Sequence, residues 1–189
     1  MVKSTKLPHP LPREVHPGVV VVDMMLTPYD QRVLRDAILS RKFTHPVDGR
    51  PNSMNKYGFV LEGHYFNRWV KWAIQKYVQP ITRYYLAPKM RKLSLRAYAM
   101  TVEYDVKKQR SLARHFDSSD VTLNVCVDGK FKGGDLILYD RKSDGRYVLK
   151  QKLGQAVVHL GRHDHRALPI KSGTRTNLVL WCKQVKRKK

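Results

Sequence analysis

The stretch HFDSSDVTLNVCVDGKFKGGDLILYD, residues 115–140, joins a candidate metal-binding motif to the pattern of two strands. His115 and Asp117 are one residue apart, so in an extended segment both side chains project to the same face. The apolar runs 120–127 and 134–139 each predict a strand. Two imidazoles and one carboxylate leave one side of a divalent metal open, which is typical of non-haem iron(II) oxygen chemistry. A second imidazole must therefore come from elsewhere in the chain.

Further strand predictions lie almost entirely in the second half of the chain. Apolar runs bounded by Gly, Asp, Lys and Ser predict strands at residues 94–104, 120–127, 134–139, 146–151, 155–160, 165–170 and 174–182. Several short strands of this kind are typical of an antiparallel sandwich or barrel. We therefore expect a mainly β protein, a jelly roll or double-stranded β-helix, with supporting helices ahead of it in the chain.

The first half of the chain predicts these supporting helices. Its proline-rich opening predicts an extended arm, because proline donates no backbone hydrogen bond, and residues 18–23 predict a first strand. Thr27 and Pro28 are typical of a helix start, and the apolar spacing after them predicts one buried face. A second apolar stripe predicts a helix over residues 64–79, which Pro80 should end or kink.

These patterns divide the chain into three expected parts. Residues 1–92 form an N-terminal arm and helical support region, residues 93–185 form the β-rich domain, and residues 186–189 form a basic tail. The tail is either a nuclear address or simply a soluble end.

Composition sets the class of protein and its partners. The 189 residues carry 37 Lys and Arg against 15 Asp and Glu, a formal net charge of +22, and the 42% hydrophobic content excludes a disordered tail. Such a charge attracts polyanions, so a nucleic-acid or acidic-protein contact stands beside a merely solvated surface. Two cysteines without framework spacing favour a reducing compartment. With no apolar leader and no run of membrane-spanning length, we expect an intracellular protein, cytoplasmic or nuclear.

The second imidazole has three candidates near the end of a later predicted strand. These are His159, His163 and His165. The pattern of residues alone does not choose among them.

Arg175 is the candidate for binding an anionic co-substrate. Alternation in the strand 174–182 places Arg175 and Asn177 on one face and Thr176, Leu178 and Leu180 on the other. A buried arginine is costly without an anionic partner, and a dicarboxylate would supply one through two parallel hydrogen bonds. The alternative is an arginine that faces solvent or pairs with Asp140 or Asp164.

Residues 115–140, together with GQAVVHLGRHDHRALPIKSGTRTNLVLW at 154–181, resemble a known enzyme group. They are similar to the 2-oxoglutarate- and iron(II)-dependent dioxygenases of the prolyl 4-hydroxylase and lysyl hydroxylase group. Within it they resemble the subgroup called 2-oxoglutarate and iron-dependent oxygenase domain-containing proteins. The resemblance covers about residues 94–183 and extends more weakly to RPNSMNKYGFVL, residues 50–61. It implies a dioxygenase domain over residues 93–185.

The resemblance implies that His115, Asp117 and His165 are the metal ligands and catalytic centre. In such enzymes an arginine ten positions after the distal histidine binds the C5 carboxylate of 2-oxoglutarate. Arg175 stands ten positions after His165, so the resemblance selects His165. His163 remains the alternative ligand.

The resemblance also implies three further residues of the co-substrate pocket. Tyr104 lies eleven residues before His115 and Asn124 nine residues after it, at positions that match relatives of the lysyl hydroxylase type. With Asn177 they would line a pocket in which Arg175 is the anchor. For Tyr104, the alternative is an ordinary strand aromatic.

The chemistry that the resemblance implies is hydroxylation of a substrate, a peptidyl Pro or Lys side chain in the first place. Fe(II) would be the metal, 2-oxoglutarate and O2 the co-substrates, and succinate and CO2 the released products; L-ascorbate is a further cofactor that the resemblance allows. The net charge keeps open a nucleic-acid-directed oxygenase. A non-catalytic basic jelly-roll binding protein should lack a ligand or the arginine, and a zinc hydrolase gives Arg175 no role.

Overall fold

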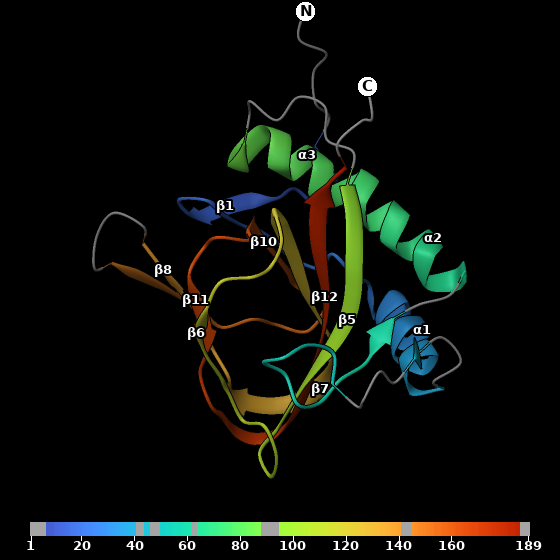
Figure 1. The fold of residues 1–189 in the computed structure, drawn as a ribbon, viewed down its shortest axis with the longest axis vertical. Coiled ribbons are helices and arrows are strands. Elements are labelled where there is room, and N and C mark those ends of the chain that lie inside the picture. The colour runs from blue at the N-terminus through green and yellow to red at the C-terminus, as the bar shows by residue number, and fades with distance from the viewer. Residues whose placement is uncertain are drawn as a thin grey trace, which may run out of the picture.

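The computed structural model of this chain describes residues 7–40, 44–45, 50–61, 64–87, 95–140 and 145–185. Two antiparallel sheets face each other, and helices cover the outer side of the larger sheet (Figure 1). The eight-stranded sheet has the order β1-β2-β10-β7-β12-β5-β4-β3, and the four-stranded sheet has the order β6-β11-β8-β9. The expected mainly β architecture with supporting helices is confirmed.

The strands have the following bounds. The large sheet contains β1 (Arg13–His16), β2 (Val19–Val22), β3 (Thr44–His45), β4 (Val60–Leu61), β5 (Leu95–Asp105), β7 (Val121–Gly133), β10 (Ala156–Leu160) and β12 (Ile170–Gln184). The small sheet contains β6 (Leu112–His115), β8 (Leu136–Tyr139), β9 (Arg146–Leu149) and β11 (His165–Ala167). The helical segments are α1 (Pro28–Leu39), α2 (His64–Ala73), η1 (Ile74–Val78), α3 (Gln79–Ile81) and η2 (Thr82–Leu86).

The helices are held against the sheet by their apolar faces. The predicted start of α1 is confirmed: Thr27 accepts a hydrogen bond from the backbone of Asp30, whose carboxylate accepts from the Thr27 backbone N–H in return. Buried residues of α1, α2 and the π-helical turns pack against Leu178 and Leu180 of β12. Within the part of the chain that the structure describes, no helix is long and apolar enough to cross a membrane.

Two local predictions are wrong. Arg13–His16 does not continue an extended arm but forms the edge strand β1, because the surrounding prolines lie outside these four residues and leave their N–H groups available for β2. Of the two outcomes predicted for Pro80, an end of the helix is wrong, because helical structure continues to Leu86. A wider π turn precedes the proline, with Gln79 N–H bonded to Ile74 O, so the chain accommodates a residue that lacks an N–H.

The pairing of β5 with β12 organises the interior between the sheets. The register runs without a break from Thr174 opposite Asp105 to Gln184 opposite Leu95. On the side away from the helices it places five pairs in a row, which we call the ladder face: Arg175 opposite Tyr104, Asn177 opposite Val102, Val179 opposite Met100, Trp181 opposite Tyr98, and Lys183 opposite Arg96. The alternation expected for Arg175 and Asn177 is therefore present.

Candidate functional site

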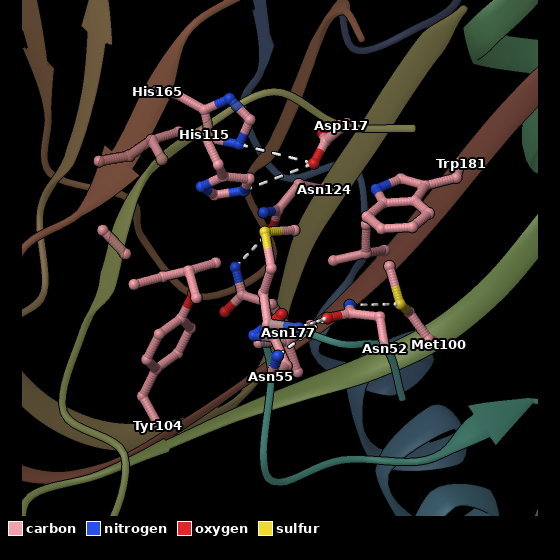
Figure 2. Close-up of a pocket in the computed structure, with 16 residues that line it drawn as sticks. Asn52, Asn55, Met100, Tyr104, His115, Asp117, Asn124, His165, Asn177 and Trp181 are labelled. Atoms are coloured by element: carbon pink, nitrogen blue, oxygen red, sulfur yellow. Dashed lines mark hydrogen bonds and ion pairs between the residues drawn. The ribbon is translucent and has the colours of Figure 1, made fainter. Parts of the chain in front are cut away.

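The structure brings His115, Asp117 and His165 together where the small sheet meets the large one. His115 ends β6, His165 begins β11, and the two are paired in register. The Asp117 Oδ1 lies 3.6 Å from Nε2 of His115 and 3.8 Å from Nε2 of His165. One donor atom of each residue lies within 4.8 Å of the other two. Figure 2 shows both imidazoles directed towards the carboxylate.

Backbone carbonyls orient both imidazoles. His115 Nδ1 donates to Ala113 O at 2.7 Å, and His165 Nδ1 donates to His163 O at 2.8 Å. Because a carbonyl oxygen only accepts, each Nδ1 carries a proton, and in a neutral imidazole the Nε2 then holds the lone pair that can bind a metal. Burial, reinforced by the nearby His159, lowers the pKa of His165 to about 4. His165 is therefore neutral at pH 7, which is the form that binds a metal.

Asp117 is fixed by the turn that follows β6. Its backbone N–H donates to Gly161 O at 2.9 Å, and its Oδ2 accepts a 2.6 Å hydrogen bond from the Thr122 hydroxyl. Burial alone would raise the pKa of Asp117, but the hydrogen bonds from His115 and Thr122 and the neighbouring imidazoles outweigh it and hold the pKa well below its usual range. The carboxylate is therefore ionised in the folded protein.

The two other candidate histidines lie behind this cluster. His159, on β10, is buried, and its Nε2 lies 3.8 Å from the other carboxylate oxygen of Asp117. Burial lowers the pKa of His159. His163 contributes its backbone carbonyl to His165. The compact three-donor group among the described residues contains His165 and neither His159 nor His163.

Arg175 is a buried cation at one end of the ladder face. The side chain is 3% exposed, and its guanidinium lies over the Tyr104 ring at 4.6 Å. Nη1 donates to Gly134 O at 2.5 Å, whereas Nε has no hydrogen-bond partner. No acidic side chain of the described residues forms an ion pair with Arg175, and Asp164 is paired with Arg114 instead. A buried guanidinium in this state is suited to an incoming carboxylate.

Tyr104, Asn124 and Asn177 line the pocket between Arg175 and the histidine cluster, which has an empty volume of about 440 Å³. The Asn177 amide donates to Asn124 Oδ1 at 2.5 Å and to Gln151 Oε1 at 2.8 Å, while its own Oδ1 has no partner. Burial raises the pKa of Tyr104 although Arg175 opposes the shift, so the phenol keeps its proton at neutral pH.

A segment from the N-terminal half closes the same pocket, and none of its residues was predicted as a site residue. Asn52, Met54 and Asn55 line the pocket, and Asn55 is 2% exposed with no partner for Nδ2 (Figure 2). Asn52 Oδ1 accepts from the backbone N–H groups of Met54 and Asn55, which fixes the turn. The one sign of this in the sequence was the weak resemblance of residues 50–61.

The donor set and the buried cation fit an iron ion and 2-oxoglutarate. Two imidazoles and an ionised carboxylate on one side leave the opposite side of a metal open. The guanidinium of Arg175 lies against the ring of Tyr104, which lines the pocket together with these donors, so a dicarboxylate that reached past Tyr104 could bridge the metal ligands and the guanidinium.

Comparison with known proteins agrees with this description, although no family model matches the chain. The fold is that of a prolyl-4-hydroxylase from Pseudomonas putida, with a TM-score of 0.65, 15% identity, and coverage of 89% of this chain and 94% of the other. The two antiparallel sheets are thus the jelly roll of the 2-oxoglutarate- and iron-dependent oxygenases.

The sequence is similar to the 2-oxoglutarate and iron-dependent oxygenase domain-containing proteins, as the resemblance indicated. The Arabidopsis thaliana protein CP2 of that name is 31% identical over 183 residues, which cover 90% of this chain and 46% of the relative. A mimivirus procollagen lysyl hydroxylase and glycosyltransferase is 36% identical over 116 residues, covering 57% of this chain and 12% of the relative. The chain therefore spans less than half the length of these curated relatives. In fold and in sequence it is similar to the oxygenase domains of the 2-oxoglutarate- and iron-dependent oxygenases.

Proposed function

We propose that this protein is an Fe(II)- and 2-oxoglutarate-dependent dioxygenase that hydroxylates a peptidyl side chain, proline or lysine. The observation that carries the proposal is the convergence of His115, Asp117 and His165 on a pocket lined by Tyr104, whose ring contacts a buried guanidinium that has no anionic partner among the described residues. A buried charged side chain that serves only the fold is normally paired with an opposite charge in the protein. Here Arg175 is left with one backbone acceptor, Gly134 O.

The three ligand residues would hold Fe(II). Asp117 contributes a charged oxygen because its carboxylate is ionised, and His165 contributes a neutral nitrogen. The Thr122 hydroxyl fixes the second carboxylate oxygen, so Oδ1 is the oxygen directed at the two imidazoles. Iron, when bound with 2-oxoglutarate and O2, supplies oxidation of a substrate C–H bond to an alcohol, coupled to conversion of 2-oxoglutarate to succinate and CO2.

Arg175 and its neighbours would bind and orient 2-oxoglutarate. The guanidinium receives the distal carboxylate, with Tyr104 covering one of its faces. Asn124 and Asn177 hold each other in place, which leaves the Asn177 Oδ1 and the pocket wall in fixed positions. Asn52, Met54 and Asn55 help to exclude water from this pocket. Exclusion of water strengthens each of these electrostatic contacts.

The peptidyl substrate is supported by the kind of proteins that share the fold and the sequence. The Pseudomonas putida structure is named a prolyl-4-hydroxylase and the mimivirus relative a procollagen lysyl hydroxylase. We therefore propose Pro or Lys within a polypeptide as the residue that is hydroxylated.

Succinate release tests the proposed activity. Purified protein should convert 2-oxoglutarate to succinate only with Fe(II) and O2, and Asp117→Ala should abolish the conversion with loss of bound metal. Peptide libraries with central Pro or Lys should gain one oxygen atom by mass spectrometry. Absence of succinate from protein that demonstrably binds metal would refute the proposal and leave a non-catalytic basic binding domain.

A further inference from the structure

A second hollow lies next to the candidate site, on the exposed part of the ladder face. Its empty volume is about 1010 Å³, and it shares Asn52 and Trp181 with the pocket that holds the histidine cluster. The rest of it is lined by Pro51, Arg96, Ala97, Tyr98, Ser118 and Lys183. A chain bound in this hollow would therefore pass directly into the pocket where the reaction is proposed to occur.

Two cations lie directly opposite each other at the outer end of this groove. Lys183 and Arg96 are paired in register on adjacent antiparallel strands, and both side chains are exposed. Like charges in that position repel each other. Lys183 Nζ donates to Ser118 Oγ at 3.4 Å, and no carboxylate of the described residues forms an ion pair with either cation. The nearby Asp120 accepts instead from the backbone N–H of Gln184.

An aromatic pair lies between these cations and the pocket. The Tyr98 and Trp181 rings have centroids 6.3 Å apart, and the Tyr98 hydroxyl donates to Pro51 O at 2.8 Å, which ties the floor of the groove to its rim. The indole Nε1 of Trp181 is buried and has no hydrogen-bond acceptor among the described residues. A buried donor without an acceptor is costly, and a carbonyl of a bound chain would satisfy it.

We propose that this groove binds an acidic segment of the polypeptide substrate, an inference that rests on the proposed hydroxylase function. Acidic side chains bind between Arg96 and Lys183, and a backbone carbonyl of the substrate accepts from the Trp181 indole. Strand geometry sets the reach: from Val179, which lines the pocket, to Lys183 is four residues, or about 13 Å. An extended peptide covers that span with about four residues. The acidic position therefore lies three to four residues from the hydroxylated one.

The local arrangement favours a peptide over a nucleic acid. A nucleic-acid strand presents a phosphate at every nucleotide and needs a basic track along its path. On the ladder face the row from Lys183 towards the pocket instead runs from one cation pair to Trp181 with Tyr98 and then to Val179 with Met100. That sequence of contacts matches one local negative charge followed by apolar and backbone groups.

Peptide binding measured without turnover tests this inference. Fluorescein-labelled peptides with a central proline or lysine in a Gly-Ser background carry a Glu-Glu pair three and four residues to one side or the other, and a neutral parent carries none. Anisotropy titrations with Mn(II) and 2-oxoglutarate should show one acidic peptide binding about tenfold more tightly than the parent. The double variant Arg96→Glu/Lys183→Glu should abolish that preference and favour a Lys-Lys peptide.

A matched control carries the same change of charge on the other side of the sheet. Arg68→Glu/Lys71→Glu alters two exposed cations of α2, which packs on the face of the sheet opposite to the ladder face, and should leave peptide preference unchanged. The proposal that the groove binds an acidic segment is overturned if the wild-type protein binds acidic and neutral peptides equally. It is also overturned if the control variant changes peptide preference as much as Arg96→Glu/Lys183→Glu does. A single-stranded DNA or RNA probe that binds through Arg96 and Lys183 and outcompetes the acidic peptide overturns it as well.

Failure of the proposed function is distinguishable from failure of the groove. If succinate release is absent but charge-reversible peptide binding is present, the hydroxylase proposal fails and the groove is supported as a peptide-binding site. If succinate release is intact but binding ignores the peptide charge, the groove fails and the hydroxylase proposal is unaffected.

Discussion

Replacing Arg175 with methionine should separate co-substrate binding from stability. Methionine has a similar length and keeps an apolar contact with the Tyr104 ring, which lies 4.6 Å from the guanidinium. It removes the charge and the hydrogen bond to Gly134 O. The variant therefore takes away the proposed anchor for 2-oxoglutarate while the space it occupied stays largely filled.

The expected loss of binding is large because the guanidinium is 3% exposed. Removing one partner of a buried, hydrogen-bonded charge pair costs about 2–5 kcal/mol. This corresponds to a dissociation constant for 2-oxoglutarate that rises roughly 30- to 5,000-fold.

Without 2-oxoglutarate, Arg175→Met should leave the free energy of unfolding unchanged or raise it. Among the described residues, Arg175 Nε has no hydrogen-bond partner and no carboxylate balances the charge, so folding buries a cation at a cost. Hydrophobic replacement of buried charged groups is often neutral or stabilising by about 1–4 kcal/mol. Wild-type protein alone should gain stability from 2-oxoglutarate, by about 2.7 kcal/mol at a hundredfold excess over the dissociation constant.

Two measurements check this reasoning. Calorimetric titration of Mn(II)-loaded protein with 2-oxoglutarate gives the change in affinity, and urea unfolding without ligand gives the change in stability. Arg175→Lys, which keeps the charge but not the planar fork, should fall between wild type and Arg175→Met in affinity. Affinity of Arg175→Met within threefold of wild type, or a loss of more than about 2 kcal/mol of stability without ligand, would show that the fold itself already satisfies the guanidinium.

Three further changes test other parts of the site. Asp117→Ala should lose bound Fe(II) and succinate release together, measured by metal analysis and product assay, and retention of stoichiometric metal would contradict the ligand assignment. Thr122→Val removes the 2.6 Å hydrogen bond to Asp117 and should weaken metal binding about 10- to 100-fold in a competition titration. An unchanged metal affinity would show that the hydroxyl does not orient the carboxylate. Gly58→Ala would place a Cβ 2.1 Å from Thr101 O at a φ of +131° and should cost more than the roughly 1–3 kcal/mol of backbone strain alone, measured by urea unfolding. Gly18→Ala, at φ +77° with its nearest atom 3.7 Å away, is the control and should show the strain alone; equal losses would mean that the turn before β4 yields easily.

Periodicity made the interior of the β-rich region predictable from sequence. Alternation along residues 174–182 predicted Arg175 and Asn177 on one face, and the same period places Trp181 and Lys183 on that face. The spacing of His115 and Asp117 predicted their convergence. The choice of His165 over His159 came from resemblance alone, because both are buried and both approach Asp117.

The closure of the pocket by Asn52, Met54 and Asn55 could not be predicted from local sequence patterns. Asn52 and Asn55 are polar residues in a turn-rich segment, and composition favours a solvated loop for such residues. Their burial depends on tertiary contacts, such as the hydrogen bond from Tyr98 to Pro51 O and that from Lys56 N–H to Gln109. In the same way the continuation of the helix past Pro80 depends on a π turn, which has no clear sequence pattern.

The unbroken pairing of β5 with β12 fixes the distance along the ladder face between the pocket and the cation pair of Arg96 and Lys183. Two more residues in each strand between Val179 and Lys183 would lengthen the ladder face by about 7 Å. The cation pair would then lie two substrate residues farther from the pocket, and every side chain would stay on its face of the sheet. A single added residue in β12 would instead invert every position beyond it and send the cation at 183 towards the helices. Proteins of this architecture can therefore change the reach of substrate selection only in steps of two.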